Sequence, residues 1–141
     1  MMRASGGPGK HSHVPTDRRY SRAGVWVRSE GPGGKLVRMG VTDHLLQQHG
    51  GLVGATVRSV GAQVAAGEEL ATLTTGRGGL GLPAPASGRI VAVNPALDLK
   101  PALVERDPYG EGWFVMIVAT RLQVEAATLL DASAYLATLA R

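Results

Sequence analysis

Short apolar runs separated by glycine-rich turns dominate the chain from residue 25 to residue 94. Val25–Val27 and Leu36–Val41 flank the turn Gly31–Gly34, which predicts a hairpin of two strands. Further apolar runs predict further strands: Leu52–Val57, Leu70–Thr75, Arg89–Asn94 and Trp113–Thr120. Two β-hairpin units of similar pattern would face one another as in a small sandwich. The pattern therefore predicts a mainly β fold.

Three segments carry helix signals instead. We expect a short helix over residues 43–49, a helical turn over residues 100–106 and a C-terminal helix after Asp131. Thr42 or Asp43 can cap the first helix, and Gly50-Gly51 can end it. Asp131 can cap the last helix, where apolar residues recur at helical spacing. These helices would flank the strands.

The length of 141 residues suits one domain, which we place at residues 14–141 behind a disordered tail of residues 1–13. Aromatic residues make up only 4%, so aliphatic side chains must fill the core. The chain has no cysteine, which excludes disulfides, thiol catalysis and zinc–thiolate sites. No apolar run approaches the ~20 residues of a membrane span, and no secretory signal is visible, so we expect a cytoplasmic protein without a membrane partner.

The net charge of +4 raises the question of nucleic-acid binding. The basic residues are scattered, with no run longer than Arg18-Arg19 and no interleaved aromatics, so we expect no nucleic-acid partner. His11 and His13 lie in the tail without a third ligand, and His44 and His49 do not share a helical face. The sequence therefore predicts no metal site.

The segment Gly76–Gly81 fits the pattern G-x-G-x-x-G. A dinucleotide site also needs a helix to begin there, and Pro83 and Pro85 prevent one. We interpret the segment as a mobile glycine-rich loop between two strands. Arg77 is its one charged group, either merely solvated or able to pair with a carboxylate or phosphate. No pair of nucleophile and base stands out, so we expect no enzyme.

The block Asp107-Pro108-Tyr109-Gly110-Glu111-Gly112-Trp113 resembles a signature of glycine cleavage system H-proteins. Further blocks are similar to that family, in its order and spacing, over about residues 14–141: Pro15-x-Asp17-Arg18-x-Tyr20, Gly40-Val41-Thr42-Asp43, Ala66-Gly67-Glu68, Ala84-Pro85-Ala86-Ser87-Gly88, Val93-Asn94-Pro95-Ala96-Leu97 and Asp131-Ala132 through Tyr135.

The resemblance implies a barrel-sandwich hybrid of the biotinyl- and lipoyl-carrier kind, with two small antiparallel sheets, short flanking helices and a C-terminal helix. In that family a lysine on an exposed hairpin carries lipoate as an amide. The lipoyl arm accepts an aminomethyl group from glycine decarboxylase, presents it to aminomethyltransferase and is reoxidised by dihydrolipoamide dehydrogenase. These enzymes and the lipoylation enzymes are the implied partners.

The chain departs from the family at the carrier position. The family's E-S-V-K-A corresponds to Thr74-Thr75-Gly76-Arg77-Gly78, so Arg77 stands at the lysine and Thr74 at the glutamate, whereas Gly88 keeps a glycine of the recognition pattern. The only lysines are Lys10, Lys35 and Lys100. We therefore expect no lipoate and two alternative roles: a non-lipoylated scaffold or regulatory partner of these enzymes, or a module that binds an anion or acidic partner through the Arg77 loop.

Overall fold

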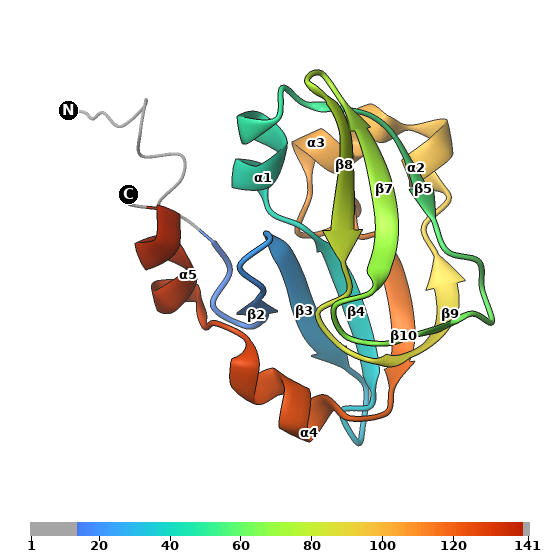
Figure 1. The fold of residues 1–141 in the computed structure, drawn as a ribbon, viewed down its shortest axis with the longest axis vertical. Helices are drawn as coiled ribbons and strands as arrows, with labels where there is room; N and C mark the ends of the chain where they lie inside the picture. The colour runs from blue at the N-terminus through green and yellow to red at the C-terminus, as the bar shows by residue number, and fades with distance from the viewer. Residues whose placement is uncertain (1–13, 140–141) are drawn as a thin grey trace.

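A computed structural model describes residues 14–139, so the predicted disordered tail, with His11 and His13, lies outside the described residues. Figure 1 shows strands in the body of the molecule and short helices at its periphery. The strands are β2 Arg19–Tyr20, β3 Val25–Glu30, β4 Leu36–Val41, β5 Leu52–Val57, β6 Gln63–Val64, β7 Glu69–Thr75, β8 Gly78–Pro83, β9 Gly88–Val93 and β10 Val115–Ala119. The helices are α1 Asp43–Gln48, α2 Ala96–Leu99, α3 Pro101–Arg106, α4 Leu122–Glu125 and α5 Ala132–Leu139, with a 3₁₀ turn at Ala126–Thr128.

The strands form two antiparallel sheets of unequal size. One has six strands in the order β2-β3-β4-β10-β9-β6, and the other has three in the order β5-β7-β8. The prediction of a mainly β barrel-sandwich hybrid with flanking helices and a C-terminal helix is confirmed. The picture of two similar hairpin units is too simple, because β9 leaves the hairpin pattern and pairs with both β10 and β6.

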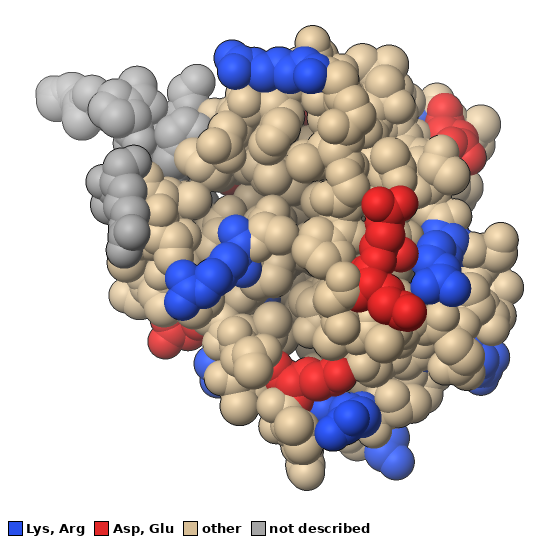
Figure 2. Space-filling model, in the orientation of Figure 1, with Lys and Arg blue, Asp and Glu red and all other residues tan. Residues whose placement is uncertain are grey.

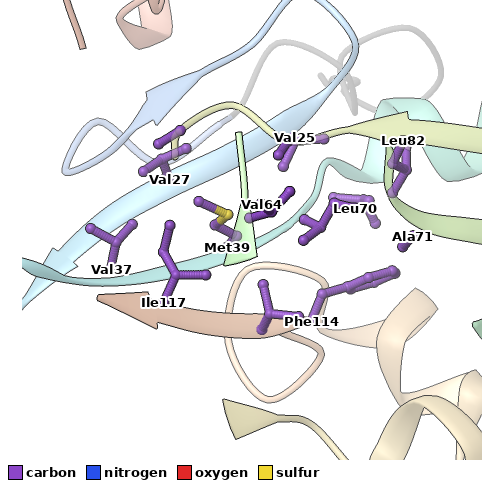
Figure 3. Packing of buried hydrophobic residues seen from close by; sticks show 14 of the residues in the cluster. Val25, Val27, Val37, Met39, Val64, Leu70, Ala71, Leu82, Phe114 and Ile117 are labelled. Atoms are coloured by element: carbon purple, nitrogen blue, oxygen red, sulfur yellow. The ribbon is translucent and has the colours of Figure 1, made fainter. Parts of the chain in front are cut away.

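The main core lies between the two sheets. In β10 the buried residues Val115, Ile117 and Ala119 alternate with more exposed ones, as a strand with one buried face requires. Val115 and Ile117 stand opposite Met39 and Val37 of β4. These residues belong to one buried cluster with Leu70 and Leu82 of the smaller sheet, and Figure 3 shows Met39 and Val64 between Ile117 and Leu70. Aliphatic side chains dominate this core, as the composition predicts.

A second, aromatic cluster joins β2, β3 and α5. Tyr20 stacks on Tyr135 with ring centroids 4.9 Å apart. Trp26 is fully buried, and the guanidinium of Arg18 lies 4.5 Å from the centroid of its ring. A Cβ on Gly40, in the neighbouring strand, would come within 2.7 Å of the indole, so this position must be glycine. The cluster attaches the C-terminal helix to the larger sheet.

The predicted helix caps are confirmed. The side-chain oxygen of Thr42 accepts a hydrogen bond from the Leu45 N–H at 3.2 Å and caps α1. Asp131 caps α5 by accepting a hydrogen bond from the Ala134 N–H at 2.8 Å. The hydroxyls of Thr42 and Tyr135 are 2.8 Å apart, so the first cap is also bonded to the last helix. Within residues 14–139, no helix has the length and apolar character that a bilayer crossing requires.

The prediction of a mobile loop at Gly76–Gly81 is wrong for most of that segment. Only Gly76 and Arg77 connect the strands, and Gly78–Pro83 is strand β8, paired along its length with β7. A strand is held by backbone N–H and C=O groups, which glycine also has, so the lack of side chains does not prevent pairing. The last strand is also shorter than predicted, because β10 begins only at Val115.

Candidate functional site

The connection between β7 and β8 is a tight turn whose geometry is fixed by Thr75. Thr75 and Gly78 form the last register pair, and Gly76 and Arg77 lie between them. The Thr75 hydroxyl accepts a hydrogen bond from the Arg77 N–H at 3.1 Å and donates one to the Gly78 carbonyl at 2.7 Å. Gly78 has φ of 108°, a conformation that favours glycine. The turn therefore has one defined backbone shape.

The turn also rests on the loop that follows α1. The Gly76 N–H donates to the Gly51 carbonyl at 3.2 Å, and the Arg77 N–H donates to the His49 carbonyl at 3.1 Å. A Cβ on Gly76 would lie 2.4 Å from the Gly50 carbonyl oxygen, which is far inside van der Waals contact. Glycine at position 76, where the family motif has valine, is thus what permits this close approach.

Arg77 projects from this fixed turn into solvent. The residue is exposed, although its Cγ lies close to Gly50. Among residues 14–139, no carboxylate comes within ion-pair distance of its guanidinium, because the five ion pairs found there involve other arginines. A guanidinium stays protonated at any physiological pH. The apex of the hairpin therefore presents one uncompensated positive charge.

These residues do not fit the attachment of lipoate. An amide-linked arm needs a primary amine, and the delocalised guanidinium of Arg77 does not supply one. No lysine occurs between Lys35 and Lys100 in the sequence. Lys35 lies in the connection between β3 and β4, and Lys100 lies between α2 and α3, so neither belongs to the β7–β8 hairpin.

Thr74 and Gly88, the other two predicted site residues, lie in different sheets. Thr74 is exposed on β7, directly before the turn, and stands opposite Gly54 and Gly79. Gly88 is buried in β9 of the larger sheet, where a Cβ would lie 2.3 Å from the Val118 carbonyl oxygen. The structure thus groups Thr74 with Arg77 on one hairpin, whereas Gly88 permits the close pairing of β9 with β10.

Sequence reasoning missed the loop that supports the turn. The sequence predicts His49, Gly50 and Gly51 only as the end of a helix, yet the carbonyls of His49 and Gly51 accept hydrogen bonds from the turn. The side chain of Glu105 accepts a hydrogen bond from the Leu52 N–H at 2.8 Å, which ties α3 to the same loop. The paired glycines at 50 and 51 and the glycine at 76 were the available signal, but nothing in the sequence places them together.

Hydrogen bonds hold the Asp107–Trp113 loop in place, and four of its residues line a hollow of about 540 Å³: Asp107, Gly110, Glu111 and Trp113. Asp107 accepts a hydrogen bond from the Glu111 N–H at 2.9 Å. The Tyr109 hydroxyl donates to Asp43 at 2.8 Å, and the indole N–H of Trp26 donates to the Pro108 carbonyl at 3.0 Å. Burial, together with the bond to Asp43, raises the pKa of Tyr109 above its usual value. The loop therefore connects α1 with the aromatic cluster.

Other kinds of site receive little support from the described part of the chain. No group of three or more His, Asp or Glu side chains within residues 14–139 is arranged to hold a metal ion. Figure 2 shows basic groups dispersed over the visible face and interleaved with acidic ones. The β7–β8 turn is therefore the strongest candidate for a functional site.

The chain is similar to known proteins along most of its length. The family model of the glycine cleavage H-protein matches residues 18–141. The glycine cleavage system H protein of Cronobacter sakazakii is 41% identical over 124 residues, which is 88% of this chain and 94% of that protein. The one from Serratia proteamaculans is 41% identical over 128 residues, covering 91% of this chain and 98% of that protein.

A solved structure agrees with these matches. The crystal structure of a glycine cleavage system H protein from Mycobacterium marinum has a TM-score of 0.80 and 33% sequence identity to this chain. The match covers 91% of this chain and 100% of that one. The family model, the related sequences and the solved structure each match most of the chain, so the chain belongs to the glycine cleavage H-protein family.

Proposed function

We propose that this member of the family carries no lipoyl group and acts in the cytoplasm as a non-catalytic scaffold or regulatory partner of glycine cleavage or lipoylation enzymes. The observation that carries the proposal is Arg77 at the apex of the β7–β8 turn, where the family's carrier lysine would stand. An arm cannot be attached through an amide at a guanidinium, so the group-carrying step is lost while the body of the protein remains.

Retention of the body supports a role in docking. The Asp107–Trp113 block is kept, and its bonds to Asp43 and Trp26 hold that side of the molecule in a defined shape. A family member with this shape and no arm can occupy the docking site of glycine decarboxylase, aminomethyltransferase, dihydrolipoamide dehydrogenase or a lipoylation enzyme. Occupation without transfer lowers the share of enzyme available to a lipoylated carrier.

A second function is favoured by the charge of the turn. The guanidinium of Arg77 has no ion-pair partner within the described residues, and the backbone beneath it is fixed by hydrogen bonds. An arginine in this setting can bind a carboxylate or phosphate through two parallel hydrogen bonds. The alternative is therefore a module that binds an anion or an acidic partner through the Arg77 turn.

A reconstituted glycine cleavage reaction tests the proposal. Purified glycine decarboxylase, aminomethyltransferase and dihydrolipoamide dehydrogenase are combined with a lipoylated H protein such as that of Serratia proteamaculans. We expect an excess of this chain to lower turnover by competition and to support no turnover alone. Turnover with this chain as the sole H-protein, or no effect in any excess, contradicts the proposal.

Two variants distinguish docking through the body of the protein from binding through the Arg77 turn. Arg77→Ala removes the charge at the turn, and Arg89→Ala removes an exposed arginine from the other sheet as a matched control. If the body mediates docking, both variants compete as well as the unchanged chain. If the Arg77 turn mediates binding, only Arg77→Ala loses competition.

A further inference from the structure

A hollow of about 460 Å³ lies at the end of the molecule opposite the β7–β8 turn. It is formed by the β3–β4 connection and by the segment that follows β10. Its lining includes the basic side chains of Lys35 and Arg121, the polar Thr120 and Gln123 and the apolar Val124, but no acidic residue. The only charged side chains of its lining are therefore positive.

Backbone hydrogen bonds fix the two sides of this hollow. The Ala119 N–H donates to the Lys35 carbonyl at 2.8 Å, so the β3–β4 connection is attached to the end of β10. The Thr120 N–H donates to the Ser87 carbonyl at 3.0 Å, and the Arg121 carbonyl accepts from the Glu125 N–H at 3.0 Å. Lys35 and Arg121 therefore lie on two backbone segments that these hydrogen bonds hold together.

The charges of Lys35 and Arg121 are not balanced within residues 14–139. Neither side chain takes part in an ion pair there. Glu125, the acidic residue nearest to Arg121 along the chain, accepts hydrogen bonds from the N–H and hydroxyl of Ser87, at 2.7 and 2.5 Å. Glu30, the acidic residue nearest to Lys35 along the chain, pairs with Arg28 and Arg38. Two uncompensated cations lining one hollow raise its potential and favour an anion between them.

The rim of the hollow is apolar on one side. Val124 is 62% exposed, although most of the other valines in the protein are buried or half-buried. A small inorganic anion would use the two cations and leave this side chain in water. A peptide with carboxylates next to an aliphatic side chain would use both features, because it would also remove Val124 from water.

The geometry points to a docking site for an acidic segment of a partner protein. Side-chain carboxylates of the segment bind Lys35 and Arg121, and a neighbouring aliphatic side chain covers Val124. The site lies at the other end of the molecule from Arg77, so a partner held here leaves the β7–β8 turn free (Figure 1). The inference does not depend on the proposed function.

Nuclear magnetic resonance with the ¹⁵N-labelled full chain tests the site. The probes are the peptide acetyl-Glu-Leu-Glu-Glu-amide, its counterpart with glutamine in place of glutamate, and inorganic phosphate. We expect the acidic peptide alone to shift the amide signals of residues 33–35 and 119–124. The double variant Lys35→Gln with Arg121→Gln should weaken its binding about tenfold, because two charge-assisted contacts are lost.

A matched double variant controls for general attraction to a basic protein. Lys100→Gln with Arg106→Gln removes the same charge from exposed side chains around α3 and should leave the affinity within about twofold. Equal loss in both double variants, shifts spread over the whole surface, or no shifts at all would overturn the inference. Phosphate binding as tightly as the peptide would also overturn it, because the hollow would then take a small anion and not a segment.

Discussion

The Asp107–Trp113 loop and the β7–β8 turn both correspond to motifs of the family, but only the loop matches its motif. The loop keeps the seven signature residues, whereas the turn carries Thr74 and Arg77 at the positions that we align with the family's glutamate and lysine. In the loop, Pro108 and Tyr109 are bonded to Trp26 and Asp43. In the turn, Thr74 and Arg77 are exposed, and their side chains bond to no other residue described.

The difference separates what the fold requires from what the family's chemistry requires. Replacing a loop residue breaks buried hydrogen bonds and packing, so stability alone preserves that loop. Replacing the exposed lysine of a hairpin costs almost nothing in stability. Only the carrier function would preserve it, and its replacement by Arg77 is what a family member released from that function would show.

Removal of the indole of Trp26 should have the largest effect. The side chain is fully buried, packs against Gly40 and donates a hydrogen bond to Pro108, so Trp26→Ala leaves a large cavity and an unpaired carbonyl. We expect a loss of about 3–5 kcal/mol in the free energy of unfolding, measured by urea denaturation. Val53→Ala, at a side chain that is 63% exposed, is the control and should stay within about 0.5 kcal/mol. A cost below about 1 kcal/mol for Trp26→Ala would contradict the account of this region.

An intermediate effect is expected at the base of the turn. Gly76→Val places a side chain against the Gly50 carbonyl and separates the turn from its supporting loop, with loss of the bonds to His49 and Gly51. The free energy of unfolding should fall by about 1–3 kcal/mol. Hydrogen exchange at the amides of residues 76 and 77 should accelerate.

The matched control for this change lies three residues further along the same hairpin. A Cβ on Gly79 would find its nearest neighbour, the Leu73 carbonyl oxygen, at 4.0 Å, so Gly79→Val has room. We expect this variant to be close to neutral and to leave the exchange of the turn amides unchanged. Equal destabilisation by both variants would show that β propensity, and not contact with the supporting loop, determines the result.

Ionisation of the three tyrosines should have the smallest effect on the free energy of unfolding near neutral pH. All three belong to the Asp107–Trp113 loop or to the aromatic cluster. Burial raises the pKa of Tyr20, Tyr109 and Tyr135 above the usual value of 10.0. The unfolded chain then loses protons at lower pH than the folded one, so stability is full below pH ~9 and falls as pH rises through 10. Urea midpoints from pH 7 to 11 should show this fall, and tyrosinate absorbance should rise only together with unfolding. Tyrosinate formed near pH 10 in a protein that remains folded would contradict the assigned burial.

Sequence patterns were sufficient where local chemistry determines structure. Thr42 and Asp131 precede helices that their side chains cap, and the turn at Gly31–Gly34 joins strands β3 and β4. The family resemblance gave the rest of the architecture. The residue pattern alone did not reveal strand β8, because three of its six residues are glycines, although Leu80 and Leu82 alternate toward the core.

The candidate site was predictable in position but not in structure. The motif order placed Arg77 on a hairpin apex, and the structure has it there. The contact of Gly76 with Gly50 joins residues 26 positions apart, and only the folded backbone brings them within van der Waals distance. For the same reason, we expect that the full family motif cannot be restored by substitutions in the turn alone, because a valine at position 76 would clash with the Gly50 carbonyl.

We propose that the β7–β8 hairpin offers no lysine on which a lipoyl arm can be built. The most direct measurement is the intact mass of the protein after co-expression with lipoylation enzymes, beside the variant Arg77→Lys with Thr74→Glu, which leaves Gly76 in place. We predict an unmodified mass for the unchanged chain and one added lipoyl group for the variant. A lipoyl group on the unchanged chain, at Lys35, Lys100 or any other residue, would contradict the account.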